Sequence, residues 1–300
     1  MRLPGADARM VLASASAMPG WVPHVEVWLL VAALVGYGVY VARVIQPAAV
    51  AGGAPPLTRR QVTWFWLGVV VFWVATDWPM HDVAEQRLYL VHMFQHVLLT
   101  VVLPPVMLLA TPEWLMRLIL GHGWFKRFVY WWARPAPALL VNAAFVGLSH
   151  AATVVNHSIS NGWLHYGVHT LLVFSFFLVW IPICGSLPEL QVTPPVKILM
   201  LFLLSVIPTI PAAFLTTAEG VLYQGYNHDP RLWGLSVTYD QQLAGIVMKV
   251  ISGFYLWGII AVVFFQWSLR DRNHRGKYRG KLVEQPEATP VPDGAPQTVD

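Results

Sequence analysis

Histidine pairs at helical spacing are the feature of this sequence with the clearest chemistry. His92 and His96 lie four residues apart in the apolar run VHMFQHVLL, and His165 and His169 repeat the spacing. Residues at i and i+4 share one face of a helix, so each pair presents two imidazoles on one side. Imidazole binds copper, zinc, iron and nickel. The pairs indicate a metal site, haem ligands, a proton path or hydrogen-bonded core residues.

Composition places these histidines in a membrane protein. The chain has 300 residues, of which 56% are hydrophobic and 11% charged, whereas a soluble domain carries about 25% charged residues. The single cysteine, Cys184, excludes an internal disulfide and a thiolate metal cluster. The sequence has no Ser-His-Asp order, phosphate-binding loop or HExxH motif, and we therefore expect a protein that is not an enzyme.

Seven apolar stretches approach the length of about 20 residues that a helix needs to cross a bilayer. We predict an all-α integral membrane protein, a seven-transmembrane-helix bundle over residues 25–267. Residues 1–24 would form an extracytoplasmic tail, and residues 268–300 a cytoplasmic tail that is first basic and then disordered. The predicted spans are 25–45, 62–78, 88–110, 136–156, 163–183, 196–217 and 241–267.

The basic residues predict the orientation of the bundle. Most of the nineteen Lys and Arg residues fall in the loops after the first, third and fifth spans or in the C-terminal tail. Cytoplasmic segments are enriched in such residues, so we expect the C-terminus in the cytoplasm and the N-terminus outside. The basic tail is accounted for by this rule and by contact with the lipid surface, and no nucleic-acid partner is expected.

This topology brings most of the histidines to one side of the membrane. His96, His150 and His169 would each lie within about 8–12 Å of the outer ends of their helices. Ionisable residues inside spans usually face the bundle interior and mark a site, because exposing them to lipid is costly. Eight of the eleven histidines fall in the outer third: His81, His92, His96, His150, His157, His165, His169 and His228.

Imidazoles at similar depth on three helices favour a metal or cofactor site over separate hydrogen-bonded histidines. Thioether is a soft ligand that favours Cu(I), and Met248 would enter the membrane from the same side, about two turns into the last span. Met93 is rotated by about 100° from His92 on its helix and is not expected to join it. The predicted metal ligands are His92, His96, His150, His165, His169 and Met248.

Four further residues near the outer face are predicted to support the site or to pass the ion on. Asp240 opens the last span, where its carboxylate would either cap that helix or orient a histidine ligand. His81, His157 and His228 lie in the outer segments, from which they would hand the ion on.

Three sequence blocks resemble the polytopic CtaG-type assembly factors of cytochrome c oxidase. The block HMFQHVLLTVVLPPVMLLATPEW carries the first histidine pair, and SHAATVVNHSISNGWLHYGVHTLLVFSFFLVWIPI carries His150 and the second pair. The block YNHDPRLWGLSVTYDQQLAGIVMKV carries Asp240 and Met248. The resemblance covers roughly residues 60–265. It departs from the family pattern in the block Leu148-Ser149-His150-Ala151, at Val168 and at Lys249.

The resemblance implies a role in the maturation of a haem–copper oxidase, with copper as the ion that is supplied or inserted. It further implies cytochrome c oxidase subunits as partners and the bacterial inner membrane as the location. The residues also allow a b-type haem electron-transfer protein, in which histidines of facing helices are axial ligands. A third alternative is a metal-free scaffold for oxidase subunits, in which the histidines serve only structure.

Overall fold

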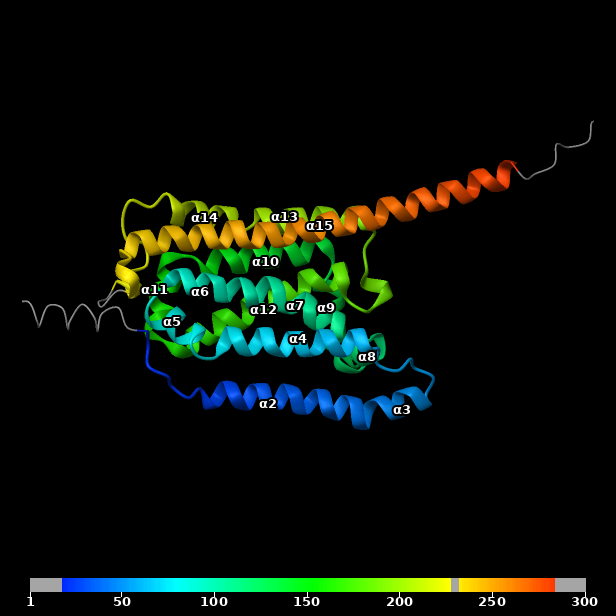
Figure 1. The fold of residues 1–300 in the computed structure, drawn as a ribbon, viewed down its shortest axis with the longest axis horizontal. Helices are drawn as coiled ribbons and strands as arrows, with labels where there is room; N and C mark the ends of the chain where they lie inside the picture. Colours follow the sequence, from blue (N-terminus) through cyan, green and yellow to red (C-terminus); the bar gives the residue numbers. More distant parts are fainter. Residues whose placement is uncertain (1–17, 228–231, 284–300) are drawn as a thin grey trace, which may run out of the picture.

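The computed structural model describes residues 18–227 and 232–283, and the regular structure in these ranges is helical (Figure 1). Within them, six helical stretches are long and apolar enough to cross a membrane, and a bent helix pair makes a seventh if its two parts count as one span. An apolar helix suits lipid because it satisfies its own backbone hydrogen bonds. The predicted all-α membrane protein is therefore confirmed, and His228 lies outside the described residues.

The six stretches agree with the predicted spans to within a few residues at most ends, and several consist of more than one helix. The first three contain α2 (Val25–Tyr40), η1 (Val41–Ile45) and α3 (Gln46–Ala51); α4 (Arg59–Thr76) and α5 (Met80–Gln86); and α6 (Tyr89–His96), η2 (Val97–Val102) and α7 (Leu103–Ala110). The last three contain α12 (Gly162–Cys184); α13 (Pro194–Val206) and α14 (Thr209–Thr216); and α15 (Val237–Val283).

The fourth predicted span is not one straight helix. It consists of α10 (Pro135–Ser149) and α11 (Ala152–Ser160), which are bent by 66° relative to each other. At the bend, the carbonyl of Val146 accepts hydrogen bonds from Ser149 Oγ at 3.1 Å and His150 Nδ1 at 2.8 Å. Side chains that bond nearby carbonyls compete with the helical pattern, and Ala151 is already extended. The helix therefore ends at His150.

The histidine-bearing helices occupy the middle of the bundle. In the apolar window of the stretch Tyr89–Ala110, 61% of the residues are buried, compared with 11% for Val25–Ala51. The α12 helix packs against α10 and α7, and α15 packs against α6, α13 and α14. Figure 1 shows α2 along one edge of the bundle and α15 along the opposite side. The central helices can therefore hold polar groups away from lipid.

Prolines or π-helical turns interrupt three of the spans, Val25–Ala51, Tyr89–Ala110 and Pro194–Thr216. The π-helical turn η2 follows directly after His96 and precedes Pro104 and Pro105. In the stretch Pro194–Thr216, α13 ends before Pro208, and the Lys249 ammonium donates to the carbonyl of Ser205 at 2.9 Å. A cation at a helix C-terminus is favourable because the last carbonyls carry partial negative charge. This contact explains a lysine inside the last span.

The end of the bundle opposite α5 and α11 is tied together by surface charges. The short helices α8 (Glu113–Leu120) and α9 (Trp124–Trp132) lie in the loop before α10. Arg117 bonds both Glu113 and Glu189, and Tyr130 donates to Glu189 at 2.6 Å. The hydrogen bonds from Arg117 and then Tyr130 hold the pKa of Glu189 at about 2.

The last helix is longer than predicted. The sequence predicts that the final span ends at residue 267 and that a basic, then disordered tail follows. In the structure α15 continues to Val283, so the basic segment 268–283 is helical. Lys and Arg are good helix formers, which accounts for the extension. Residues 284–300 lie outside the described residues.

Candidate metal centre

The two histidine pairs meet between α6 and α12 and form a ladder of four imidazoles. On α6, the Nε2 atoms of His92 and His96 are 3.0 Å apart. On α12, the ring centroids of His165 and His169 are 4.2 Å apart. The rings of His96 and His169 are separated by 4.4 Å, and those of His92 and His165 by 5.8 Å. Each pair does share one face of its helix, and the deeper rung of the ladder is the tighter one.

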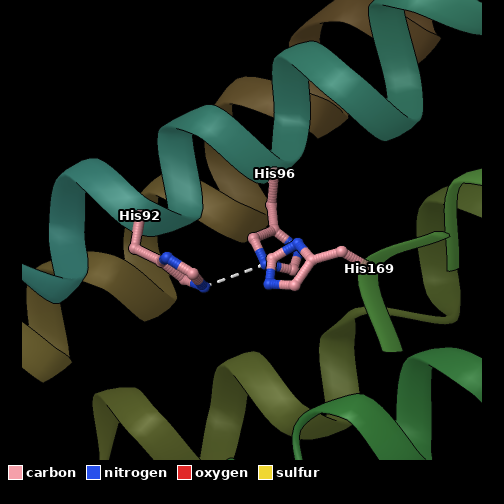
Figure 2. Close-up of side chains that lie close together, drawn as sticks. All are labelled: His92, His96 and His169. Atoms are coloured by element: carbon pink, nitrogen blue, oxygen red, sulfur yellow. Dashed lines mark hydrogen bonds between the residues drawn. The ribbon is translucent and has the colours of Figure 1, made fainter. Parts of the chain in front are cut away.

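Three of these imidazoles are arranged so that they can hold a metal ion. Figure 2 shows His92 and His96 pointing from α6 toward His169 of α12. Their ligand nitrogens all lie within 4.8 Å of one another, and His92 is only 5% exposed. Two nitrogens bound to one tetrahedral ion lie about 3.3 Å apart, given metal–nitrogen bonds of about 2.0 Å. The 3.0 Å between the Nε2 atoms of His92 and His96 is close to this length, so we infer that small movements would complete a three-coordinate site.

His150 and Met248 lie at the inner side of this triad. The His150 ring is 6.0 Å from that of His96. Because the Val146 carbonyl only accepts hydrogen bonds, His150 Nδ1 carries the proton and its Nε2 keeps a lone pair. His150, Met248 and His96 line a small apolar cavity of about 40 Å³. Neither His150 nor Met248 belongs to the converging group, but both border the space next to it.

Glu85 is a site residue that was not predicted from the sequence. One oxygen, Oε1, lies 3.1 Å from His165 Nε2 and 3.3 Å from His92 Nδ1. A carboxylate near Nδ1 favours the tautomer of His92 that leaves Nε2 free to bind a metal. The signal in the sequence is a lone glutamate four residues after His81 and seven before His92. A spacing of seven residues places two side chains on one face only if the helix is continuous over two turns. Because the chain breaks between α5 and α6, the spacing alone did not predict the contact.

A tyrosine cluster covers the other side of His92. Tyr89 stacks on the His92 ring at 5.6 Å with the planes 19° apart. Tyr223 and Tyr226 each contact Tyr89 at 4.9 Å, and Tyr223 donates to the His150 carbonyl at 2.8 Å. These rings pack between α6 and the segment before α15, and they limit the positions that the His92 ring can take. These tyrosines could not be found from the sequence, because they have no diagnostic spacing from the histidines.

Asp240 holds the histidine helix itself. The sequence predicts that Asp240 caps its own helix or orients a histidine. In the structure its side chain is completely buried and accepts hydrogen bonds from the backbone N–H groups of Tyr89 and Leu90, both at 3.0 Å. These groups begin α6, so Asp240 caps a different helix from its own. A carboxylate there satisfies orphan donors and complements the helix dipole, and it anchors α6 two residues before His92.

The other predicted transfer residues are not brought to the centre. His81 packs against His24 with the ring centroids 5.0 Å apart, and its Nδ1 lies 3.4 Å from Gln95 Nε2. His157 is bonded through Nδ1 to the carbonyl of Thr153 at 2.7 Å. The short helices α5 and α11 carry these two side chains, and neither belongs to the converging group. His228 lies outside the described residues.

Comparison with known proteins gives a family match that covers this site. The family described as cytochrome c oxidase caa3 assembly factor (Caa3_CtaG) matches residues 35–270, which includes every residue of the histidine ladder. No curated protein and no solved structure was found to match the chain. The match spans more than three quarters of the sequence and confirms the resemblance that the three blocks indicate. The chain is a multi-span helical membrane protein that belongs to the Caa3_CtaG family of cytochrome c oxidase caa3 assembly factors.

Proposed function

We propose that this protein binds one copper ion at His92, His96 and His169 and assists its insertion into a haem–copper oxidase. The observation that carries the proposal is the convergence of three imidazoles in the interior of a membrane bundle that belongs to an oxidase assembly family. Neutral imidazoles bind copper without adding charge to the interior. The protein thus acts by holding and releasing its cargo, rather than by catalysing a bond change.

The orientation of the bundle sets the side on which copper is handled. The helices α6, α12 and α15 all begin at the end of the bundle that holds the ladder (Figure 1). The opposite end carries the basic loop with Arg117 and Lys126, and the basic end of α15 extends beyond it. By the positive-inside rule, the ladder then lies near the outer face of the bacterial inner membrane. Oxidase subunits would receive copper at that face.

The number of ligands suits a carrier that releases its ion. Three imidazoles are enough to hold copper, and a coordination number of three leaves room for a fourth ligand from the receiving protein. The thioether of Met248 and the free Nε2 of His150 border the adjoining cavity and offer additional soft or neutral donors. We propose that these two residues hold the ion when the imidazoles of the ladder release it.

Haem is a weaker candidate for this site. The cavity lined by His150 and the four histidines of α6 and α12 has a volume of about 20 Å³, whereas a porphyrin needs a wide, flat slot between its axial ligands. The rings of His96 and His169 are also only 4.4 Å apart. The arrangement therefore favours an ion over a macrocycle.

Metal content and an absorption spectrum of the protein purified in mild detergent test the proposal. We expect about one copper per chain and no Soret band, because a single triad converges. His92→Ala combined with His96→Ala removes two ligands and should abolish copper retention. His157→Ala is the matched control, since this exposed histidine bonds only a backbone carbonyl.

Two outcomes would contradict the proposal. Copper content like that of the wild type in the double variant would exclude the assigned ligands, and a Soret band would favour haem. Co-purification of oxidase subunits should be tested in the same preparations. If the double variant lacks copper and still supports oxidase maturation in cells, the metal-free scaffold is the better explanation.

A further inference from the structure

Glu85 connects the two histidine helices at the outermost rung of the ladder. The same oxygen, Oε1, contacts His92 of α6 and His165 of α12, at 3.3 Å and 3.1 Å. His165 is not a member of the converging triad. A carboxylate that served only to orient His92 would not need a second imidazole from another helix. Glu85 and His165 together therefore form a separate pair of donors, here named the loading pair.

Exposure decreases from the loading pair to His92, the triad member that Glu85 contacts. The Glu85 side chain is 28% exposed, that of His165 is 13% exposed, and that of His92 is 7% exposed. Glu85 lies in the last turn of the short helix α5, at the end of the bundle. It is thus the site group that an ion from solution reaches first. A negative charge at the mouth of a low-dielectric site raises the local concentration of cations and the rate at which they arrive.

The donor atoms become softer from the loading pair toward the inner cavity. The loading pair offers one carboxylate oxygen and one imidazole, the triad offers three imidazoles, and the cavity beneath His96 is bordered by the thioethers of Met93 and Met248. Hard donors bind copper less tightly than soft ones when the ion is Cu(I). His165 precedes His169, and His92 precedes His96, by about one helical turn, or about 5.4 Å. Each step inward is therefore short and leads to a softer set of ligands.

We propose that Glu85 and His165 form the loading pair of the copper site, which captures the incoming ion and passes it to His92, His96 and His169. This inference rests on the proposed function, because it assumes that the triad binds copper. The ion displaces the Glu85–His165 contact, is held by Oε1 and the imidazole, and then moves one turn inward along α12. The pair thus controls the rate of loading, whereas the triad determines the occupancy.

The test measures how fast the purified full-length protein takes Cu(I) from a chromophoric chelator. Glu85→Gln keeps the size of the side chain and removes its charge. We expect its loading rate to fall at least about tenfold, the lower limit of electrostatic steering, and to lose the dependence on ionic strength that the wild type shows. His165→Ala should also load slowly and still reach about one copper, because the triad is intact. Glu26→Gln, at the same end of the molecule, is the matched control and should load normally.

The outcomes separate this inference from the proposed function. If the wild type takes up no Cu(I), the proposed function fails. If the wild type takes up Cu(I) and Glu85→Gln loads equally fast with the same salt dependence, the loading pair is wrong, whatever the final affinity. Faster release with normal loading would show that Glu85 only orients His92. Glu85→Asp restores the charge and should recover part of the rate, which distinguishes a lost carboxylate from a misfolded variant.

Discussion

Two groups of histidines lie at the same end of this molecule, and only one of them is arranged for a metal. In the triad, the Nε2 atoms of His92 and His96 face each other at 3.0 Å. In the second group, the histidine clasp formed by His24, His81 and Asp82, the His24 Nε2 atom lies 2.7 Å from the Asp82 carboxylate. The Nδ1 atom of His24 lies 3.3 Å from Glu26.

The difference lies in which ring nitrogens already have a carboxylate. Both nitrogens of His24 are engaged by acids, so its ring serves as a bridge between α2 and α5. In the triad, the one nearby carboxylate reaches Nδ1 of His92 and leaves Nε2 for an ion. Histidine density therefore does not define a metal site. Convergent nitrogens with lone pairs define it, and an acid can either create or remove them.

Removing one imidazole from each group should give the largest difference in copper affinity between the two groups. His169→Ala deletes one of three converging donors, and we expect copper affinity to fall by more than the ~10–100-fold that loss of a partner of a metal ligand costs. His81→Ala should change affinity by less than about threefold, since its ring contacts His24 and Gln95. Competition titration with a Cu(I) chelator measures both. Equal losses in the two variants would show that the clasp also binds the ion.

The cap on α6 should give the next largest effect. Asp240→Asn keeps one of the two oxygen acceptors, removes the charge, and places an NH2 group against one of the buried N–H groups of Tyr89 and Leu90. We expect a loss of about 1–2 kcal/mol in stability, together with weaker copper binding as α6 loosens. Thermal unfolding in detergent and the same titration provide the measurements. Glu219→Gln, an exposed acid in the preceding loop, is the control. Unchanged melting and affinity in Asp240→Asn would mean that α6 needs no anchor.

The sequence was sufficient for the parts of this site that depend on local spacing. Apolar length predicted most of the spans, and i, i+4 spacing predicted that each histidine pair shares a face. Both follow from the geometry of a single helix. The bend after Ser149 was not predicted, because it results from side chains that compete for one carbonyl at the position of His150.

Contacts between segments that are distant in the sequence could not be predicted from spacing. Asp240 caps a helix 150 residues earlier in the chain, whereas its position at the start of α15 suggested a cap on its own helix or a partner for a histidine. Glu85 contacts His165, which lies 80 residues later in the chain, and a helix break separates Glu85 from His92. Such partners depend on how helices pack, which a spacing pattern does not encode. Carboxylates that flank histidine-bearing spans are the signal to look for.

The smallest expected effect is the pH dependence of the histidine clasp. Burial by itself lowers the pKa of His24, but the hydrogen bond and charge of Asp82, assisted by Glu26, raise it above its ordinary value of 6.5. The charged pair therefore contributes its full stability below about pH 6.5 and loses it as the pH rises through the raised pKa. His81 also faces His24, and its protonation at low pH would oppose the pair.

Hydrogen exchange at the start of α2 measures this effect. Between pH 6 and pH 9, we expect protection factors in the first turn of α2 to fall by about threefold to tenfold. In His24→Gln they should not depend on pH, because the amide does not titrate. The effect stays small since Trp28 Nε1 also donates to Asp77 at 3.0 Å, a tie that neutral-range pH leaves in place. Constant protection in the wild type would show that His24 does not change its protonation state in the clasp over this range. A loss of bound copper over the same range would instead connect the clasp to the triad and remove the distinction between the two groups.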